Sequence, residues 1–293
     1  MNDLDVVIVT AEGAWELVRD CLDSLCAHPP ATAHMAVHVV DNASRDGTPD
    51  RIRARYPDVN VAALDRNSGF GYASNYGVKR TRAPFVLLLN PDTVLQAGAI
   101  DTLLGAFART PRAAVVGPRL LRTDGSLDHN AKRSFPSPSA AFGHLIRGVT
   151  PGRLRSGSGY SRADIDECAD AAVEAVSGAC MLVRRAALPD VGLLDEHYWM
   201  YGEDLDWCRR FLEHGWEVRY IGGATVVHVG HGVTGARRSV RVNWAFHRAM
   251  GRFYRRWEAG ERPLLDLAVY TAVLLRFALS TLCATLARGR EDM

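Results

Sequence analysis

The residues best suited to chemistry in this chain are Asn90, Pro91 and Asp92, which follow the apolar run 84–89. An uninterrupted run of six apolar residues predicts a strand that is buried on both faces of a sheet. A carboxylate just beyond such a strand lies at its carboxyl end, where open α/β sheets bind ligands. Asp92 is therefore suited to hold a divalent cation against a diphosphate. A Pro-Asp turn that simply ends the strand is the plainer interpretation, and the rest of the chain must decide.

Two further polar segments in the first half follow predicted strands or open predicted helices. Asp41 ends the strand 36–40. It can accept hydrogen bonds from a base or a ribose hydroxyl, or it can cap the turn into the next helix. Asn67 and Gly69 stand in a glycine-rich turn before a helix, where backbone N–H groups can approach a nucleotide or phosphate. This turn matches the dinucleotide-binding motif too loosely to predict a nicotinamide site.

The second half adds an acidic pair and a histidine. Glu203 and Asp204 begin a predicted helix after the aromatic segment 199–202. They can cap the helix and interact with its dipole, or supply a carboxylate base beside an aromatic wall that binds a sugar. His228 ends a strand and precedes a flexible glycine, so we favour metal binding over a structural role. Zinc is not expected, because no nearby cysteine completes a set of four ligands.

These residues require a sheet whose strands end at a common edge. The apolar patterns predict strands over 4–10, 36–40, 59–64, 85–89, 113–117, 175–183, 218–221 and 224–228. They predict helices over 15–27, 48–56, 72–81, 97–109, 204–214 and 240–257. Strands that alternate with helices indicate a mostly parallel sheet with right-handed crossovers. Residues 147–172 lack periodicity and are predicted to be a mobile loop or an insertion.

Composition narrows the class of protein. The 293 residues are 47% hydrophobic and 23% charged, as in an ordinary globular protein. A formal net charge of +2 without a long basic run gives no reason to expect nucleic-acid binding. The six cysteines form no CxxC pair, and no signal peptide precedes the first predicted strand. We therefore expect a reduced, cytoplasmic protein.

Taken in order, these motifs resemble glycosyltransferase family 2, and within it the rhamnosyltransferase-like branch, over roughly residues 4–250. Each segment is weakly specific alone, whereas five in the family's order and spacing are strongly specific. The matching segments are Val-Asp-Asn-Ala-Ser at 40–44, Asn-x-Gly-Phe-Gly-x-Ala-x-Asn at 67–75, Leu-Asn-Pro-Asp at 89–92, Ser-Gly-Ala-Cys-Met-Leu-Val-Arg-Arg at 177–185, the segment 192–206 that holds Gly-Glu-Asp-x-Asp, and His228.

The resemblance implies an α/β GT-A fold: a Rossmann-like, mostly parallel sheet with flanking helices, extended here by C-terminal helices. We expect a catalytic domain over 1–240, with a nucleotide-binding half to about 117 and an acceptor half from about 118, followed by helices over 241–293. The implied enzyme is inverting. It moves a sugar, with rhamnose favoured, from a dTDP- or UDP-sugar to a hydroxyl of a cell-envelope, polyprenyl-linked or secondary-metabolite acceptor.

The resemblance also implies roles for single residues. The implied metal, Mn²⁺ or Mg²⁺, is held by Asp92 and His228. The implied catalytic base is Asp204, with Glu203 as its neighbour. The residues implied to bind the nucleotide sugar are Thr10, Asp41, Asn67, Gly69, Asn90 and Gly178. Arg133 contacts phosphate or acceptor, or lies solvated on the surface, and we favour the surface. Two alternatives are a nucleotidyltransferase and an inactive family member that serves as a binding subunit.

The C-terminal segment 264–287 is apolar, with only Asp266 and Arg276 charged. It is long enough to span a bilayer, but each charge opposes burial at the bilayer centre. We therefore expect an amphipathic helix on the inner face of the cell membrane, with arginines before it facing anionic lipid. The alternative is packing against the catalytic domain or against a second subunit in a homodimer.

Overall fold

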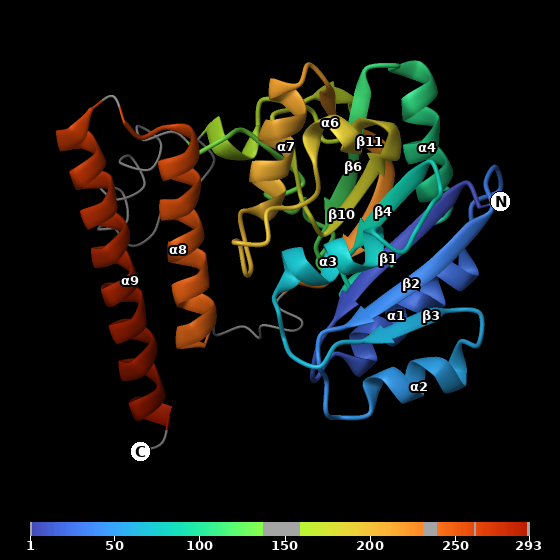
Figure 1. Cartoon of the computed structure of the whole chain (residues 1–293), viewed down its shortest axis with the longest axis horizontal. Coiled ribbons are helices and arrows are strands. Elements are labelled where there is room, and N and C mark those ends of the chain that lie inside the picture. The colour runs from blue at the N-terminus through green and yellow to red at the C-terminus, as the bar shows by residue number, and fades with distance from the viewer. Residues whose placement is uncertain (1, 137–158, 231–238, 261, 292–293) are drawn as a thin grey trace.

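A computed structural model describes residues 2–136, 159–230, 239–260 and 262–291. Helices flank a central sheet, and α8 and α9 stand beside it as a separate pair (Figure 1). The strands are β1 (Leu4–Thr10), β2 (Met35–Asp41), β3 (Asn60–Ala63), β4 (Phe85–Leu89), β5 (Thr93–Leu95), β6 (Ala113–Leu121), β7 (Lys132–Arg133), β8 (Ala171–Ala172), β9 (Ala175–Val176), β10 (Cys180–Arg184) and β11 (Glu217–His228). The helices are α1 (Trp15–Ala27), α2 (Thr48–Arg55), α3 (Phe70–Val78), α4 (Ala99–Arg109), α6 (Leu188–Val191), α7 (Glu203–Glu213), α8 (Val240–Trp257) and α9 (Pro263–Glu291), with short 3₁₀ turns η1 (Gly159–Ser161) and η2 (Arg185–Ala187).

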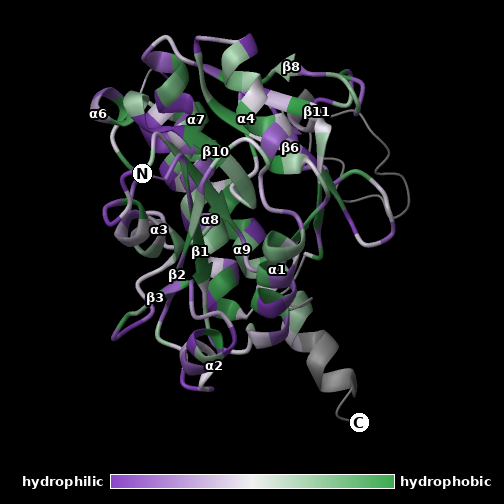
Figure 2. Ribbon diagram, turned by 90° about the vertical axis from the view of Figure 1, so that its right-hand side faces the viewer, coloured by the Kyte–Doolittle hydropathy of each residue, from purple (hydrophilic) through white to green (hydrophobic). Residues whose placement is uncertain are grey.

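The first half of the sheet is parallel, in the order β3-β2-β1-β4. All seven residues of β1 are buried, as expected for a strand covered on both faces. Figure 2 shows hydrophobic residues concentrated in these central strands. Because Thr10 pairs with Asp41 and Ile8 pairs with Leu89, the polar residues that follow β1, β2 and β4 reach one edge of the sheet. The sequence predicted this edge.

The second half of the sheet is built around β10, which runs antiparallel to both β4 and β6. β11 is parallel to β6 and antiparallel to β5 and β8. The sequence predicted two strands where β11 is one, and that prediction is wrong. The pairing register shifts between Ile221 and Thr225, so the glycines at 222 and 223 mark a bulge rather than a strand end. A Cβ on Gly222 would lie 2.2 Å from the carbonyl carbon of Cys168, which explains the glycine.

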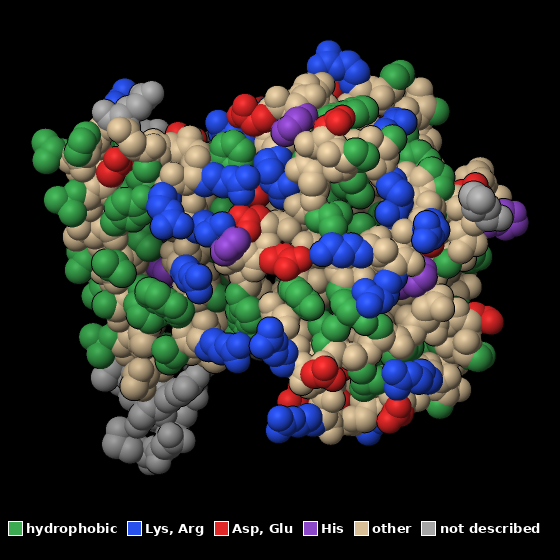
Figure 3. All heavy atoms as spheres, in the orientation of Figure 1, with side chains coloured by type: hydrophobic (Ala, Val, Ile, Leu, Met, Phe, Trp, Pro, Cys, Tyr) green, Lys and Arg blue, Asp and Glu red, His purple; other side chains and the backbone are tan. Residues whose placement is uncertain are grey.

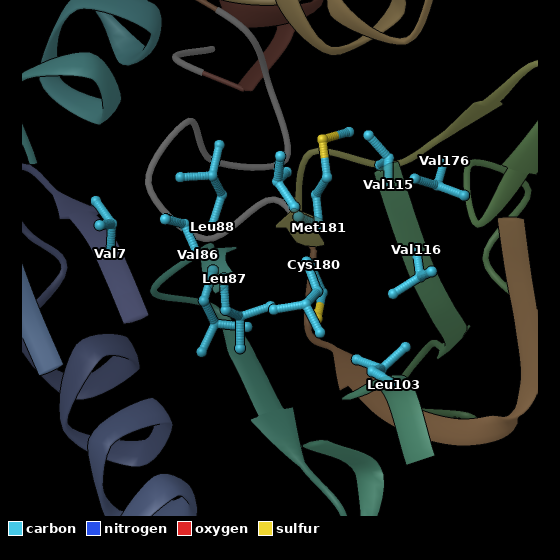
Figure 4. Packing of buried hydrophobic residues seen from close by; sticks show 14 of the residues in the cluster. Val7, Val86, Leu87, Leu88, Leu103, Val115, Val116, Val176, Cys180 and Met181 are labelled. Carbon is cyan, nitrogen blue, oxygen red and sulfur yellow. The ribbon is translucent and has the colours of Figure 1, made fainter. Parts of the chain in front are cut away.

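The core lies where β4 meets β10. Leu87, Leu88, Cys180 and Met181 are at most 2% exposed. Leu88 and Met181 point to one face of the sheet, and Leu87 and Cys180 point to the other (Figure 4). Truncation of one such core leucine to alanine typically lowers the free energy of unfolding by about 2–5 kcal/mol. The core therefore holds the carboxyl end of β4, and the residues after it, in a fixed position.

Part of the segment predicted to be a mobile loop is packed against the sheet. Residues 147–158 lie outside the described residues, but 159–172 are described. The Tyr220 hydroxyl donates to the Glu167 carbonyl at 2.5 Å, and the Lys132 ammonium group donates to the Ile165 carbonyl. Turns capped by aspartates, such as Asp166 accepting from the Cys168 N–H at 2.8 Å, stabilise this part without apolar periodicity.

The C-terminal helices form an antiparallel hairpin. The Asn243 amide donates to the Ser280 hydroxyl at 2.9 Å near one end. At the other end, the Tyr254 hydroxyl donates to Asp266 at 2.6 Å. One of the two charges predicted to oppose membrane burial is therefore bonded within the hairpin. The boundary at residue 240 between catalytic domain and extension stays a prediction.

Asp195 connects this hairpin to the sheet domain. Its carboxylate accepts from Arg252 Nη2 at 2.8 Å and from Arg256 Nη1 at 3.0 Å, both on α8. Burial alone would raise the pKa of Asp195, but the hydrogen bonds with Arg252 and His197 hold it well below its ordinary value of 3.8. The ionised form is thus favoured in the folded protein.

We expect Asp195→Asn to lower the free energy of unfolding by about 1.5–3 kcal/mol at pH 7, the range for hydrogen bonds to charged groups. Because the folded-state pKa is depressed, this contribution is present above the ordinary pKa and is lost as the pH falls below it. The difference between variant and wild type should therefore shrink from pH 7 to pH 3 in urea unfolding. The exposed Asp58 supplies the control Asp58→Asn. An equal difference at both pH values would contradict the assignment.

Candidate active site

Thr10 and Asp41 lie side by side at the carboxyl ends of β1 and β2. The Asp41 carboxylate accepts from the Ser44 N–H at 2.8 Å and from the Ser44 hydroxyl at 2.5 Å. Asp41 thus stabilises the turn toward α2, which is the capping role that the sequence left open. The buried Thr10 hydroxyl has no hydrogen-bond partner in the described part of the chain. The role of both residues in binding the donor stays a prediction.

The glycine-rich turn contacts the aromatic segment before α7. The Asn42 amide donates to the Gly69 carbonyl at 3.2 Å, and Asn67 accepts from the Gly69 N–H at 3.2 Å. The Phe70 N–H donates to the Trp199 carbonyl at 2.8 Å. A Cβ on Gly69 would lie 2.4 Å from the same carbonyl oxygen. Asn67 therefore shapes the turn, and Gly69 permits its close approach to Trp199.

Gly69→Ala should destabilise the protein for two reasons. Gly69 has a φ of +91° and a ψ of 170°, a region that is essentially restricted to glycine and costs other residues about 1–3 kcal/mol. The added methyl group also overlaps Trp199, and overpacking costs about 1–3 kcal/mol more. Gly98 has a φ of +73° with a ψ of 2°, and a Cβ there would meet no atom within 4 Å, so Gly98→Ala measures the cost of a left-handed backbone without any overlap. Thermal unfolding should show the larger decrease for Gly69→Ala; equal decreases would mean that the contact with Trp199 is unimportant.

The end of β4 brings Asn90 and Gly178 together. The Asn90 N–H donates to the Ala179 carbonyl at 2.8 Å, and Gly178 immediately precedes Ala179. Beyond Asn90, the Asp92 carbonyl accepts from the Val229 N–H at 2.9 Å. This second bond places the end of β11 next to Asp92. Three sequence segments far apart along the chain therefore meet at this edge.

His228 lies between two aspartates. Its Nε2 is 3.5 Å from Asp92 Oδ1, and its Nδ1 is 2.9 Å from Asp128 Oδ2. Burial disfavours the charged ring, but hydrogen bonds to Asp128 and Asp92 raise the pKa of His228 to about 9. Burial likewise opposes ionisation of Asp128, yet the His228 contact lowers the pKa of Asp128 to about 2. Asp128 thus fixes the ring so that Nε2 faces Asp92.

Asp92 and His228 fit a divalent cation as a partial set of ligands, provided that the cation displaces the proton from His228 Nε2. Within the described ranges, no group of three or more His, Cys, Asp or Glu side chains could hold a metal by itself. Magnesium and manganese prefer oxygen ligands, and magnesium is commonly bound by one or two carboxylates together with substrate phosphates and water. A carboxylate that bonds the other nitrogen of a metal-binding histidine orients the ring, and Asp128 occupies that position.

Arg133 is buried, and the prediction that it lies solvated on the surface is wrong. Its side chain is 6% exposed, and Nη2 donates to Asp204 Oδ2 and to the Val176 carbonyl, both at 2.6 Å. The short strand β7 pairs with β9, which turns this arginine toward α7. Although burial opposes its charge, the carboxylate of Asp204 raises the pKa of Arg133 above its ordinary value. The two side chains form a buried ion pair.

Asp204 stands beside the edge of the sheet. Its carboxylate accepts from the Gly178 N–H at 3.0 Å and from the Leu205 N–H at 2.8 Å, in addition to Arg133. A Cβ on Gly178 would lie 3.2 Å from the Asp204 Cβ. Gly178 therefore lets the start of α7 approach the end of β4, and Asp204 lies next to the strand that leads to Asn90.

Glu203 is buried at the first position of α7, and its environment differs from that of its neighbour. Burial and the charge of Asp204 raise the pKa of Glu203 to about 8. Its Oε2 atom has no hydrogen-bond partner among the residues that the structure describes. Glu203 therefore carries a proton near neutral pH, whereas Asp204 is surrounded by donors, as a carboxylate requires.

The role of Asp128 beside His228 and the inward position of Arg133 were not predicted from the sequence. Asp128 and Arg133 both follow β6 in a segment without apolar alternation, where Leu127 forms an isolated bridge to Leu121. A local signal for Asp128 does exist: its carboxylate accepts from the Asn130 N–H at 2.9 Å, a turn typical of aspartate. That signal predicts a turn but gives no indication of His228, which is 100 residues away.

Known proteins are similar to most of this chain. The family model described as "Glycosyl transferase family 2" matches residues 5–192. An N-acetylglucosaminyl-diphospho-decaprenol L-rhamnosyltransferase of Mycobacterium tuberculosis (strain ATCC 25618 / H37Rv) is 35% identical over 237 residues, which cover 77% of this chain and 75% of the relative. Rhamnosyltransferase WbbL of Escherichia coli (strain K12) is 26% identical over 237 residues, covering 77% and 83%.

Solved structures share the fold. Mannosyltransferase PcManGT from Pyrobaculum calidifontis, in complex with GDP-Man and Mn²⁺, aligns with a TM-score of 0.59 at 16% identity, over 99% of this chain and 75% of that one. GalNAc-T7 with UDP, GalNAc and Mn²⁺ aligns with a TM-score of 0.64 at 14% identity. That alignment covers 88% of this chain and 48% of GalNAc-T7. At these identities the likeness is one of architecture.

Proposed function

The chain belongs to glycosyl transferase family 2 and has the GT-A fold, and from this we propose that it transfers rhamnose from a nucleoside-diphosphate sugar to a lipid-linked acceptor. It is a glycosyltransferase, with relatives that are rhamnosyltransferases. One observation carries the geometric argument: Gly178 brings Asp204 beside the strand end that leads to Asp92. Asp92 from the first half of the chain and Asp204 from the second half thus lie at the same edge of the sheet.

In this proposal, Asp204 accepts the proton of the acceptor hydroxyl as that hydroxyl attacks the anomeric carbon. Transfer is a single displacement with inversion. Arg133 and the Gly178 N–H hold the carboxylate in one orientation. Fixed geometry of this kind can supply about 7–11 kcal/mol of the barrier when both substrates are bound in line.

The donor would lie along the carboxyl ends of β1, β2 and β4. Thr10 and Asp41 stand where base and ribose would bind, and Asn67, Gly69 and Asn90 surround the path toward the diphosphate. A bound Mn²⁺ or Mg²⁺ would be held by Asp92 and His228 and would offset charge on the leaving nucleoside diphosphate. Asp128 would keep the His228 ring oriented toward it.

A screen of nucleotide sugars tests the function. Thermal shift with and without Mn²⁺ should single out a dTDP- or UDP-sugar, and transfer to a short isoprenyl-diphosphate-linked sugar should release free nucleoside diphosphate. Release of pyrophosphate would instead indicate nucleotidyl transfer. Product analysis should show inversion at the anomeric carbon. If no nucleotide sugar is hydrolysed or transferred, the proposal fails.

We also infer that α9 lies on the membrane surface, at the inner face of the cell membrane. It is long and apolar enough to cross a membrane, and none of its most apolar stretch is buried. Its exposed large residues lie on one side at helical spacing, which forms a leucine stripe: Leu264, Leu267, Leu274, Leu275, Leu279 and Leu282. Arg276 lies at the border of this stripe by the same spacing, where its charge can reach water.

Replacing Leu267 and Leu274 together by glutamine should abolish flotation with liposomes that contain anionic lipid. The two leucines are 65% and 56% exposed, so the change leaves the core intact and removes apolar contact worth about 1.5–3 kcal/mol for each residue. Donor hydrolysis should stay at the wild-type level, which checks the fold. Undiminished flotation of the double variant would show that the stripe is not the membrane contact.

A further inference from the structure

A pocket of about 230 Å³ opens between the aromatic segment before α7 and the helix α8. It lies outside the site at the sheet edge, and its walls combine rings with guanidinium groups. The lining residues that matter here are Tyr198, Trp199, Arg241, Trp244, Arg248 and Arg252. A pocket of this composition suits a compact anion, because arginine binds phosphate groups through parallel N–H donors.

The positive charge of the pocket is only partly neutralised. Arg252 pairs with Asp195 at 2.8 Å. Arg241 lies over the ring of Trp199, 4.5 Å from its centroid, which orients the guanidinium group without offsetting its charge. Arg248 is exposed and forms no ion pair or hydrogen bond with any residue in the described ranges. Two of the three arginines therefore have charge available for a ligand.

Two aromatic residues of the pocket wall carry polar atoms that are buried in the protein. The Tyr198 hydroxyl and Trp199 Nε1 are buried, and neither has a partner among the residues that the structure describes. A buried donor without an acceptor destabilises a protein by about 1–3 kcal/mol. Neither atom has surface open to the pocket, and the carbon bonded to Trp199 Nε1 faces Gly69, so the arginines supply the attraction for an anion.

The aromatic segment separates this pocket from the acidic pair. Tyr198 packs against Gly202, since a Cβ there would lie 3.2 Å from the tyrosine ring. Gly202 immediately precedes Glu203 and Asp204 at the start of α7. On the other side of the same segment, Trp199 contacts the glycine-rich turn. The segment 198–202 therefore forms both a wall of the pocket and the approach to the start of α7.

The apolar side of the hairpin borders the same region. Trp244 lines the pocket and packs on Phe277 of α9, with ring centroids 5.0 Å apart. Figure 3 shows Lys and Arg side chains gathered between the apolar side chains of the hairpin and the sheet domain. A ligand whose anionic group adjoins a long apolar chain would match this arrangement, with the anion at the arginines and the chain along the apolar side chains of the hairpin.

We propose that this arginine pocket binds the diphosphate of an isoprenyl-diphosphate-linked acceptor, with the isoprenyl chain directed toward the leucine stripe and the membrane. The inference rests on the proposed function, because it assigns the acceptor's anchoring group to particular residues. Arg241 and Arg248 supply the charge, and the rings of Tyr198 and Trp199 form part of the wall. Neither arginine takes part in the chemical step.

The test compares R241Q/R248Q with R255Q, which removes an exposed arginine of the same helix outside the pocket. Binding of geranyl diphosphate and of inorganic pyrophosphate is measured by calorimetry in EDTA, so that binding through a metal is not scored. We expect saturable binding that is at least tenfold weaker in R241Q/R248Q and unchanged in R255Q, as for the loss of charge-assisted hydrogen bonds. Equal affinities in all three proteins, or no saturable binding by wild type, would overturn the proposal.

Two further measurements separate the possible outcomes. Flotation with phosphatidylglycerol vesicles tests whether the pocket binds the headgroup of a bulk lipid instead. If R241Q/R248Q lost flotation but bound geranyl diphosphate as tightly as wild type, the proposal would be overturned. In transfer assays, R241Q/R248Q should raise the acceptor KM about tenfold and leave the donor KM unchanged. If wild type turns over no nucleotide sugar, the proposed function fails, whereas the calorimetry still decides whether the pocket binds a diphosphate.

Discussion

Asp204→Asn should lower the rate of sugar transfer by about 10²-fold or more, the scale of general-base loss, while donor binding stays close to wild type. An asparagine amide keeps the size of the side chain but cannot take the proton of an acceptor hydroxyl. The carboxylate accepts from Arg133, Gly178 and Leu205, so the residue is held where a base would be needed. Single-turnover transfer and titration with nucleoside diphosphate give the two readouts.

Stability must be controlled in this experiment, because Asp204→Asn leaves the buried guanidinium group of Arg133 without its counter-charge. Breaking a buried pair by removing one partner costs about 3–5 kcal/mol. The double variant R133Q/D204N removes both charges and should recover part of that loss without recovering transfer. Recovery of activity in the double variant would mean that the single variant was merely unfolded.

Glu203→Gln is the matched comparison. With a pKa of about 8 in the folded protein, Glu203 is already protonated near neutral pH, so a neutral isostere should retain most activity. The raised pKa also predicts how stability depends on pH. The folded state binds the proton more tightly, so stability falls as the pH rises from the ordinary value of 4.5 toward 8. Glu203→Gln should flatten that fall. An inactive Glu203→Gln variant together with an active Asp204→Asn variant would mean that Glu203, and not Asp204, is the catalytic base.

Asp92→Ala and His228→Ala should each remove the metal dependence of donor binding. Their facing atoms are 3.5 Å apart, and they are the two protein groups placed to share one cation. Calorimetry of nucleoside diphosphate with Mn²⁺ and with EDTA should show a large difference for wild type and almost none for either variant. Unchanged manganese dependence in both variants would remove the assignment.

Asp128→Asn should have a smaller effect on the same titration. Loss of the partner of a metal-binding histidine typically weakens metal affinity about 10–100-fold. Asp124, which accepts from the Ser126 N–H at 2.9 Å in the exposed turn that precedes Asp128, gives the control Asp124→Asn. An Asp128 variant equal to that control would limit Asp128 to a structural role.

The sequence predicted the sheet edge well because its strands are long, apolar and local. The run before Asn90 and the alternation of strands and helices place Asp41 and Asp92 at one edge without any knowledge of distant contacts. The helix that begins at Glu203 was predicted within one residue for the same reason, since it is strongly periodic. The helix over 240–257 also has the predicted bounds.

The features that the sequence did not predict are short strands and contacts between residues that lie far apart along the chain. β5 and β7 have three and two residues, too few for a periodic pattern. Arg133 points inward only because β7 pairs with β9, more than 40 residues later. Asp128 meets His228 only because β11 returns to the sheet beside β5. Such residues are identified by tertiary pairing, which local propensity cannot supply.

The leucine stripe on α9 has a consequence for handling the protein. In buffer without lipid, the stripe has no apolar phase to enter, and large exposed apolar patches drive association. Two copies can cover each other's stripes, so the apparent mass should rise with protein concentration. A mild detergent should shift the population toward the monomer, because the micelle replaces the second copy. A dimer observed in plain buffer would then reflect the absent bilayer rather than the working state of the enzyme.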